Sequence, residues 1–246
     1  MTAFLATHGT SGLVLSLDDE VANERIVSEI KRGRYEASEL AIASRFVRES
    51  DRVLELGAGV GFISAGVMRN VGPAYYAAVE ADARLIPHIR ETHDRNAVHG
   101  VEVINAAFTS DPETLAAGAV AFTLHREFWR SGIGQTQPGS AETVSVPARD
   151  VSRFLDEKDI TVLIADIEGA ELELLRHMDT AGLEKIVLEL HPQRIGKAGV
   201  LEIFQILCAS GFAYNTALSE GSVVCFEAVT SRSAATQEPA FSTGRA

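Results

Sequence analysis

The sequence predicts an α/β protein built on a mostly parallel β-sheet with helices on both faces. From residue 52 onward, short β-rich runs alternate with helical patterns. A glycine-rich loop stands directly between the first such run and the first helix, and two β-rich runs separated by a short turn close the region. Alternating strands and helices are typical of parallel sheets, because each helix returns the chain to the end of the sheet at which the preceding strand began. The closing pair is predicted to be antiparallel.

The first half of this region contains three predicted strands and two predicted helices. The β-rich runs lie at residues 52–56, 74–80 and 101–107, and the helical patterns at 62–71 and 85–97. Gly72 and Pro73 end the first helix, because neither residue continues a helix easily.

The second half adds four strands and a strongly amphipathic helix. The strands are predicted at residues 161–165, 185–190, 212–217 and 222–229, with a short helix between the first two. Before Gly211, apolar residues recur at the spacing that places them on one face of a helix: Val200, Ile203, Phe204, Leu207 and Cys208.

Three segments do not follow this alternation of strands and helices. Helical patterns near residues 21–30 and 38–47 predict a helical cap over 1–50, which precedes a main domain at 51–230. The insertion at about 110–151 is either a lid or binding loop, or a β-hairpin that only extends the sheet. The tail at 231–246 has little to bury and is predicted to be disordered.

Composition limits the classes of partner. Lys and Arg number 22 against 34 Asp and Glu, a formal charge of −12 that repels a phosphate backbone, so nucleic acid is not an expected partner. No apolar run has the length of a membrane span, and the first residues lack a secretion signal. Cys208 and Cys225 stand in apolar contexts, so the expected compartment is the cytoplasm. A monomer and a homodimer are both left open.

The loop in VLELGAGVGF has the composition of a ligand-binding turn. Gly57, Gly59 and Gly61, with Ala58 between the first two, let the backbone turn sharply and let a ligand approach without meeting a Cβ atom. Such a loop can also serve only to pack a helix on a sheet. The GxGxG spacing and Glu55 on the strand end disfavour a pyrophosphate and favour a cationic ligand such as S-adenosylmethionine.

The next two strand ends supply further candidates for ligand contact. Glu80, followed by Ala81 in AAVEAD, is predicted to accept hydrogen bonds from the hydroxyls of a ribose. The alternative is that Glu80 or Asp82 caps the following helix. An adenine is predicted to rest on the end of the third strand, unless this is an ordinary strand terminus: Asn105, Ala106, Ala107 and Phe108.

Together these features resemble the class I S-adenosylmethionine-dependent methyltransferases over about residues 52–229. The resemblance implies a Rossmann-like, seven-stranded sheet with an antiparallel last strand, provided that residues 120–124 belong to the insertion. The string VLIADIEGAELELL, followed by VLELHP, is similar to the FkbM-type methyltransferases, which typically carry D-[IV]-E-G-A-E here. Tyr35 and Glu36 fit the same pattern, and Glu36 is assigned to the cofactor on that ground. Members often have a lysine where Ala165 stands, so its role is absent or supplied by another residue.

The resemblance implies O-methylation of hydroxyl groups, and this chemistry needs a general base or a metal ion. Asp166 is the first candidate for the base, at the end of an apolar strand near the donor, unless it only binds backbone amides in the turn. Glu168 is a second catalytic candidate, with a helix-terminal charge as the alternative. Glu171 is expected to be a solvated helix residue.

Glu189 and His191 end the next strand and are predicted to face the same opening. His191 is a candidate for taking the acceptor's proton. No metal is favoured, because the sequence holds no compact metal motif; if one is bound, Asp166 and Glu189 are the predicted ligands. In the insertion, His125 is another possible base, and Phe128 and Trp129 are either acceptor contacts or core residues.

The expected function is therefore methyl transfer from S-adenosylmethionine to a hydroxyl of a small molecule, natural product or sugar. Three alternatives stay open: an N-methyltransferase, a dinucleotide-binding oxidoreductase, and a catalytically silent binding protein of the same fold. The GxGxG loop after Glu55 disfavours the oxidoreductase. Ala165, where members often have a lysine, leaves the catalytically silent protein open.

Overall fold

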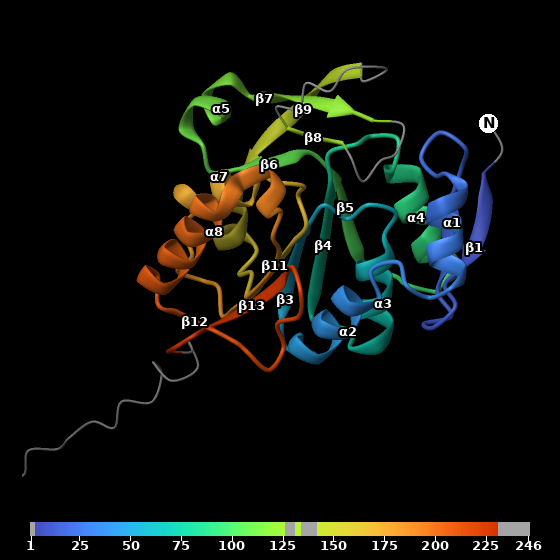
Figure 1. The fold of residues 1–246 in the computed structure, drawn as a ribbon, viewed down its shortest axis with the longest axis horizontal. Coiled ribbons are helices and arrows are strands. Elements are labelled where there is room, and N and C mark those ends of the chain that lie inside the picture. The colour runs from blue at the N-terminus through green and yellow to red at the C-terminus, as the bar shows by residue number, and fades with distance from the viewer. Residues whose placement is uncertain (1–2, 126–130, 134–141, 231–246) are drawn as a thin grey trace, which may run out of the picture.

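A computed structural model describes residues 3–125, 131–133 and 142–230 of the chain. Its main feature is a seven-stranded sheet whose strands follow the order β12-β13-β11-β10-β3-β4-β5 (Figure 1). β13 is antiparallel to β11 and to β12, and the other pairs are parallel. The predicted sheet and its antiparallel last strand are thus confirmed. In chain order the strands are β3 (Arg52–Leu56), β4 (Tyr75–Glu80), β5 (Val101–Asn105), β10 (Val162–Ala165), β11 (Lys185–Glu189), β12 (Phe212–Tyr214) and β13 (Val223–Ala228).

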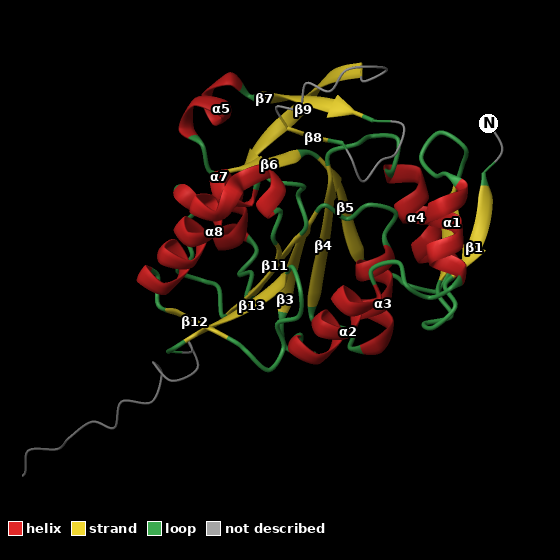
Figure 2. Ribbon diagram, viewed as in Figure 1, coloured by secondary structure: helices red, strands yellow, loops and turns green. Residues whose placement is uncertain are grey.

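Helices cover both faces of this sheet (Figure 2). On one face lie α2 (Ala37–Phe46), α3 (Phe62–Asn70) and α4 (Ile86–Arg95), and on the other α6 (Val151–Glu157), α7 (Glu171–Arg176) and α8 (Pro192–Ala209). Successive strand residues point to opposite faces, so Val53 joins the first hydrophobic core and Leu54 the second. The sheet is buried on both sides, which explains its near-continuous apolar strands.

The amino-terminal region contains a β-hairpin in addition to the two predicted helices. The hairpin pairs β1 (Phe4–Thr7) with β2 (Val14–Leu17), and α1 (Glu24–Lys31) follows. It is tied to α4 by a hydrogen bond of 3.1 Å from the Ser16 amide to Thr92 Oγ1, and Ser16 Oγ lies 3.0 Å from His88 Nδ1. Four-residue strands are too short for periodicity to reveal, so the sequence predicts only the helices here.

The insertion forms a second sheet and does not extend the main one. This sheet has the order β6-β9-β7-β8 and lies above β4 and β5 in Figure 1. The strand predicted at 101–107 divides between β5 of the main sheet and β6 of the small one. The small sheet's elements are β6 (Ala107–Thr109), β7 (Ala119–Leu124), β8 (Gly132–Ile133) and β9 (Glu142–Asp150), with α5 (Pro112–Ala117) between β6 and β7. Phe128, Trp129 and the tail predicted at 231–246 lie outside the described residues.

No helix in the described part of the chain is both long and apolar enough to cross a membrane.

A buried ion pair ties two parts of the main sheet together. Lys185 Nζ lies 2.6 Å from Asp51 Oδ2, and both side chains are almost fully buried. Asp51 also accepts hydrogen bonds from the Arg48 amide and from Thr161 Oγ1. The two buried charges therefore pair with each other, and Asp51 has two further hydrogen-bond donors.

We expect the Asp51→Ala substitution to leave the Lys185 ammonium buried without its partner. The free energy of unfolding, measured by urea titration, should fall by about 3–5 kcal/mol. The double variant Asp51→Ala, Lys185→Met should recover part of this loss. Removing one partner of the exposed Arg153–Glu157 pair, as in Glu157→Ala, should cost at most about 1 kcal/mol. Equal losses in the two single variants would contradict this account.

Candidate functional site

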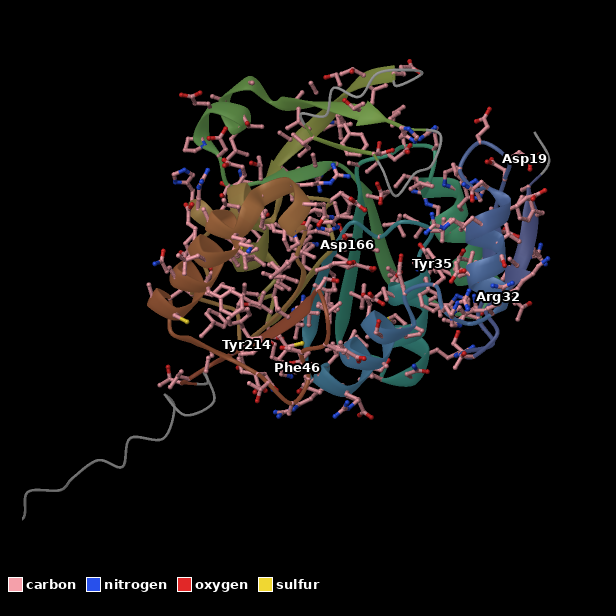
Figure 3. All side chains as sticks on the ribbon, viewed as in Figure 1. Asp19, Arg32, Tyr35, Phe46, Asp166 and Tyr214 are labelled. Carbon is pink, nitrogen blue, oxygen red and sulfur yellow. The ribbon has the colours of Figure 1, made fainter. Side chains whose placement is uncertain are left out.

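The carboxyl ends of the parallel strands open onto two adjoining cavities. The larger is a cleft of about 810 Å³, open solvent at its mouth included. The smaller cavity shares Glu36, Leu56, Gly57 and Asp166 with the cleft. Figure 3 shows Asp166 near the middle of the molecule, between the main sheet and the small one. The region is the crevice in which open α/β sheets bind their ligands.

The glycine loop is held tightly against two neighbouring strands. The amides of Gly57 and Ala58 both donate to the Val79 carbonyl at 3.0 Å. Gly57 has a φ of 84°, and a Cβ atom at this position would lie 1.8 Å from the Asp166 carbonyl oxygen. Glycine is therefore required here both by the backbone angle and by the close approach of the next strand. The loop leads into α3, which begins after Gly61.

Glu80 is fixed by backbone amides at the floor of the cleft. Its Oε2 accepts a hydrogen bond of 2.8 Å from the Gly59 amide, and its Oε1 one of 2.8 Å from the Asp82 amide. Burial raises the pKa of Glu80 to about 7, although these hydrogen bonds act in the opposite direction. Neither Glu80 nor Asp82 is the cap residue of α4, whose N-cap is Leu85.

One end of the cleft is apolar. Ala106, Ala107 and Phe108 line it from the segment after β5, and Phe122 and Ile133 line it from the small sheet. Asn105 does not line the cleft; its amide group donates to the carbonyls of Glu80 and Ala81 and so fixes the neighbouring turn. The insertion thus forms one wall of the site.

Five carboxyl side chains line the smaller cavity together with apolar residues of the main sheet and α3. They come from α2 and its start, from β3, and from the ends of β10 and β11: Glu36, Glu39, Glu55, Asp166 and Glu189. Glu55 is 2% exposed and its Oε2 has no hydrogen-bond partner. Burial raises the pKa of both Glu55 and Glu36 to about 8. These buried carboxyl groups resist ionisation, so a cationic ligand that pairs with their ionised forms is favoured.

Asp166 lines both cavities and is anchored by its own backbone. Its amide donates to the Leu56 carbonyl at 3.0 Å, which continues the pairing of β10 with β3. Its Oδ1 has no hydrogen-bond partner and lies 3.6 Å from His191 Nε2. Burial, and then the charges of Glu189 and Glu36, raise the pKa of Asp166 well above its ordinary value. Since its side chain does not satisfy the turn, the alternative of a purely backbone-binding role loses support.

Glu168 lines the larger cleft on the other side of the same turn. Its backbone is left-handed, with a φ of 55°, and its Oε2 accepts a hydrogen bond of 2.9 Å from Arg194 Nη2. The Arg194 contact was not foreseen, because the two residues are far apart in the sequence.

Glu171 is fully buried, so the expectation of a solvated helix residue is wrong. Its Oε1 accepts a hydrogen bond of 2.8 Å from the Gly169 amide and lies 2.8 Å from His191 Nδ1. One feature of the sequence could have indicated this burial. Glu171 is the first residue of α7 and follows the tight turn at Gly169, and from this position its side chain reaches back to the turn.

His191 stands behind the acidic residues of the site. It is 6% exposed and is not among the residues that line the two cavities. Burial lowers the pKa of His191, but the hydrogen bond to Glu171 and the charges of Glu171, Glu168 and Glu189 raise it overall. His125 is also not among the residues that line the two cavities; its amide donates to Ser131 of the cleft wall, and its carbonyl accepts a hydrogen bond from Arg84.

Three of these residues are close enough to surround a metal ion. Asp166, Glu189 and His191 each offer a ligand atom, and these atoms lie within 4.8 Å of one another. The sequence named the first two as ligands in case a metal is bound.

Comparison with known proteins gives a family match. Residues 74–214 match the model of the family described as Methyltransferase FkbM domain. No curated protein sequence matches the chain closely enough to count as a relative.

Solved structures resemble the chain in fold. Trm5b from Pyrococcus abyssi has a TM-score of 0.51 at 13% identity, over 91% of this chain and 55% of that one. TYW2 from M. jannaschii, in complex with AdoMet, has a TM-score of 0.48 at 12% identity, over 93% and 88%. An rRNA methylase from Streptococcus thermophilus has a TM-score of 0.42 at 12% identity, over 78% and 95%. The chain spans about half the length of Trm5b, and at such identity the likeness concerns the fold alone.

The buried acids of the site predict a stability that declines as the pH rises. The pKa of Glu55 is about 8 in the folded protein, above its ordinary value of 4.5, so folding favours the protonated form. The contribution of Glu55 to the free energy of unfolding is complete below pH 4.5, its ordinary pKa, and is lost as the pH rises toward 8. We expect the free energy of unfolding to fall more steeply over this range in the wild-type protein than in Glu55→Gln. The exposed Glu113→Gln serves as control and should leave the slope unchanged; identical slopes in all three proteins would refute the assignment.

Proposed function

The chain belongs to the FkbM methyltransferase family, since the family match covers more than half of its 246 residues, and we propose that it transfers a methyl group from S-adenosylmethionine to a hydroxyl oxygen of a small molecule, natural product or sugar. Its fold is the Rossmann-like class I methyltransferase fold. The observation that carries the proposal is Asp166, a carboxylate with an unpaired oxygen at the junction of the two cavities.

We propose that the larger cleft holds the methyl donor. Its apolar end, around Phe108 and Phe122, suits an adenine ring, and Glu80 offers its free lone pairs to the ribose hydroxyls. The amino group and the sulfonium of the donor are cations, and Glu55 and Glu36 on the side of the smaller cavity are suited to balance them. The donor then satisfies the buried acids that would otherwise resist ionisation.

We propose that the acceptor enters the smaller cavity and meets the methyl group beside Asp166. The acceptor oxygen forms a bond to the methyl carbon while the carbon–sulfur bond breaks and its electron pair stays on sulfur. The hydroxyl proton passes to Asp166. Holding oxygen, carbon and sulfur in line supplies much of the acceleration, because two reactants become one ordered assembly.

The carboxylates of the smaller cavity bear on the kind of acceptor. Carboxyl oxygens accept hydrogen bonds, so Glu39 and Glu189 in the smaller cavity suit a molecule with several hydroxyl groups, such as a sugar. The same observation favours an amine as the second candidate, in which case the reaction is N-methylation. Nucleic acid stays outside the proposed acceptors because of the formal charge of −12.

Donor binding can be tested without knowing the acceptor. In isothermal titration calorimetry, S-adenosylhomocysteine should bind to the wild-type protein and NADH should not. The Glu80→Gln variant should bind S-adenosylhomocysteine about 10-fold more weakly or worse, since a charged hydrogen bond contributes about 1.5–3 kcal/mol. Glu113→Gln should bind like the wild type. Binding of NADH in place of S-adenosylhomocysteine would overturn the proposal in favour of the oxidoreductase.

The role of Asp166 is tested by turnover. Cell extracts divided into small-molecule, polysaccharide, protein and RNA fractions are incubated with the protein and radiolabelled S-adenosylmethionine. We expect label in the small-molecule or polysaccharide fraction, and a loss of about 10²–10⁴-fold in its rate for Asp166→Asn, because a general base contributes on that order. Asp156→Asn, on the exposed side of α6, is the matched control. Label confined to RNA, or an unchanged rate in Asp166→Asn, would contradict the acceptor or the base respectively.

A further inference from the structure

One arginine side chain connects the turn after β4 with the small sheet. The guanidinium of Arg84 holds both carboxylate oxygens of Asp82: Nε donates to Oδ1 at 2.9 Å, and Nη2 donates to Oδ2 at 2.6 Å. The same Nη2 donates to the His125 carbonyl at 2.8 Å. Arg84 follows β4 and His125 follows β7, so the side chain bonds two segments that are 41 positions apart.

The connection continues into the wall of the larger cleft. The His125 amide donates to Ser131 Oγ at 2.9 Å, and Ser131 is buried. Ser131 leads directly into β8, whose two residues pair with β7. Ser131, β8 and Phe122 of β7 all line the cleft. The position of this part of the wall therefore depends on the carbonyl that Arg84 holds.

At its other end the connection reaches Glu80 on the floor of the cleft. The Asp82 side chain is 1% exposed, and the Asp82 amide donates to Glu80 Oε1 at 2.8 Å. The Asp82 carboxylate also accepts a hydrogen bond of 3.0 Å from the Arg84 amide, which closes the turn. The floor of the cleft and its wall are thus joined through this turn.

β7 and β8 form the edge of the small sheet that is farthest from its links to the main domain. In the order β6-β9-β7-β8, the chain enters the sheet from β5 at β6 and leaves it from β9 into α6. The core of the small sheet is separate from those of the main sheet, and Ala81 packs against it. Because β7 and β8 are remote from both chain links, the bond from Arg84 bears directly on how firmly they stay over the cleft.

We propose that Arg84 is a positioning residue that fastens the β7–β8 edge over the cleft and thereby sets the affinity for the adenosine part of the methyl donor. The effect on the donor rests on the proposed function, in which the adenine lies between Phe108 and Phe122. Arg84 is not among the residues that line the cleft, so it acts through the wall and not by contact with the donor. A planar guanidinium suits this task, because it can bind a carboxylate with two nitrogens and still donate to a carbonyl.

The fastening can be measured in the free protein, without donor or acceptor. Hydrogen–deuterium exchange followed by mass spectrometry reports how often the amides of each strand open. In Arg84→Met we expect the amides of β7 to exchange about 10-fold faster than in the wild type, since a hydrogen bond to a charged group contributes on that order. Exchange in β3 and β4 should be unchanged.

The matched control is Arg95→Met, which removes an exposed arginine of α4 from its pair with Glu91. It should leave exchange in β7 as in the wild type. Two results would overturn the inference: unchanged exchange of β7 in Arg84→Met, or an equal acceleration in β3 and β4, which would indicate a general loosening of the fold.

A second variant separates the fastening of the wall from the neutralisation of Asp82. In Arg84→Lys the ammonium can still pair with Asp82, but the side chain ends about one bond short of the nitrogen that reaches His125. We expect β7 to exchange as fast in Arg84→Lys as in Arg84→Met. Exchange restored to the wild-type rate would show that Arg84 only neutralises Asp82. Arg84→Lys also carries the test if Arg84→Met, which leaves Asp82 buried and unpaired, does not fold.

The effect on the donor is measured with two ligands that share the adenosine. Isothermal titration calorimetry gives the Kd of S-adenosylhomocysteine and of methylthioadenosine, which lacks the amino-acid part. Arg84→Lys should weaken both by the same factor, at least about 5-fold. Glu55→Gln should weaken S-adenosylhomocysteine alone, because Glu55 is assigned to the amino group and the sulfonium. Arg95→Met should bind both ligands like the wild type.

Unchanged affinities in Arg84→Lys, or a loss confined to S-adenosylhomocysteine, would overturn the role of Arg84 in donor binding. A failure of the proposed function gives a different result. In that case the wild type binds neither ligand, while the exchange of β7 in the Arg84 variants still decides whether this side chain fastens the wall.

Discussion

The close contact between the glycine loop and the end of β10 is the constraint on which the site depends. The space between Gly57 and the Asp166 carbonyl holds no Cβ atom, and the Asp166 amide pairs with Leu56 at the same level. The loop after β3 and the acidic turn after β10 are consequently one structure. Neither segment can shift without the other, so the position of the Asp166 carboxylate relative to the cleft is fixed.

Parallel strands explain why so many acids meet at one place. All parallel strands end on the same side of the sheet. Here β3, β4, β10 and β11 each have a carboxylate at or next to their last residue. Burial raises the pKa of Glu55, Glu80 and Asp166, so these three groups are harder to ionise. The charge is balanced locally by backbone amides at Glu80 and by Arg194 at Glu168, and Glu171 is hydrogen-bonded to His191. The balance is incomplete toward the cavities, where a cationic ligand would finish it.

Sequence patterns predicted the main sheet, its helices and the position of Asp166, because each depends on local periodicity and on strand order. They did not predict the β1–β2 hairpin, whose strands are too short to show a period, or the division of residues 101–107 between two sheets. Glu171 was misjudged because its burial arises from the fold of the preceding turn and from His191, twenty positions further along. Long-range contacts of this kind leave no trace in local composition.

The small sheet over the cleft has a core of its own. Ala107, Val120, Phe122 and Val146 pack together apart from the two cores of the main sheet. Changes in this layer therefore alter the wall of the cleft without disturbing the strands that carry the acids. Substitutions in β6–β9 can therefore change the shape of the cleft wall, and with it the ligands that fit, while the acidic residues at the strand ends of the main sheet keep their positions.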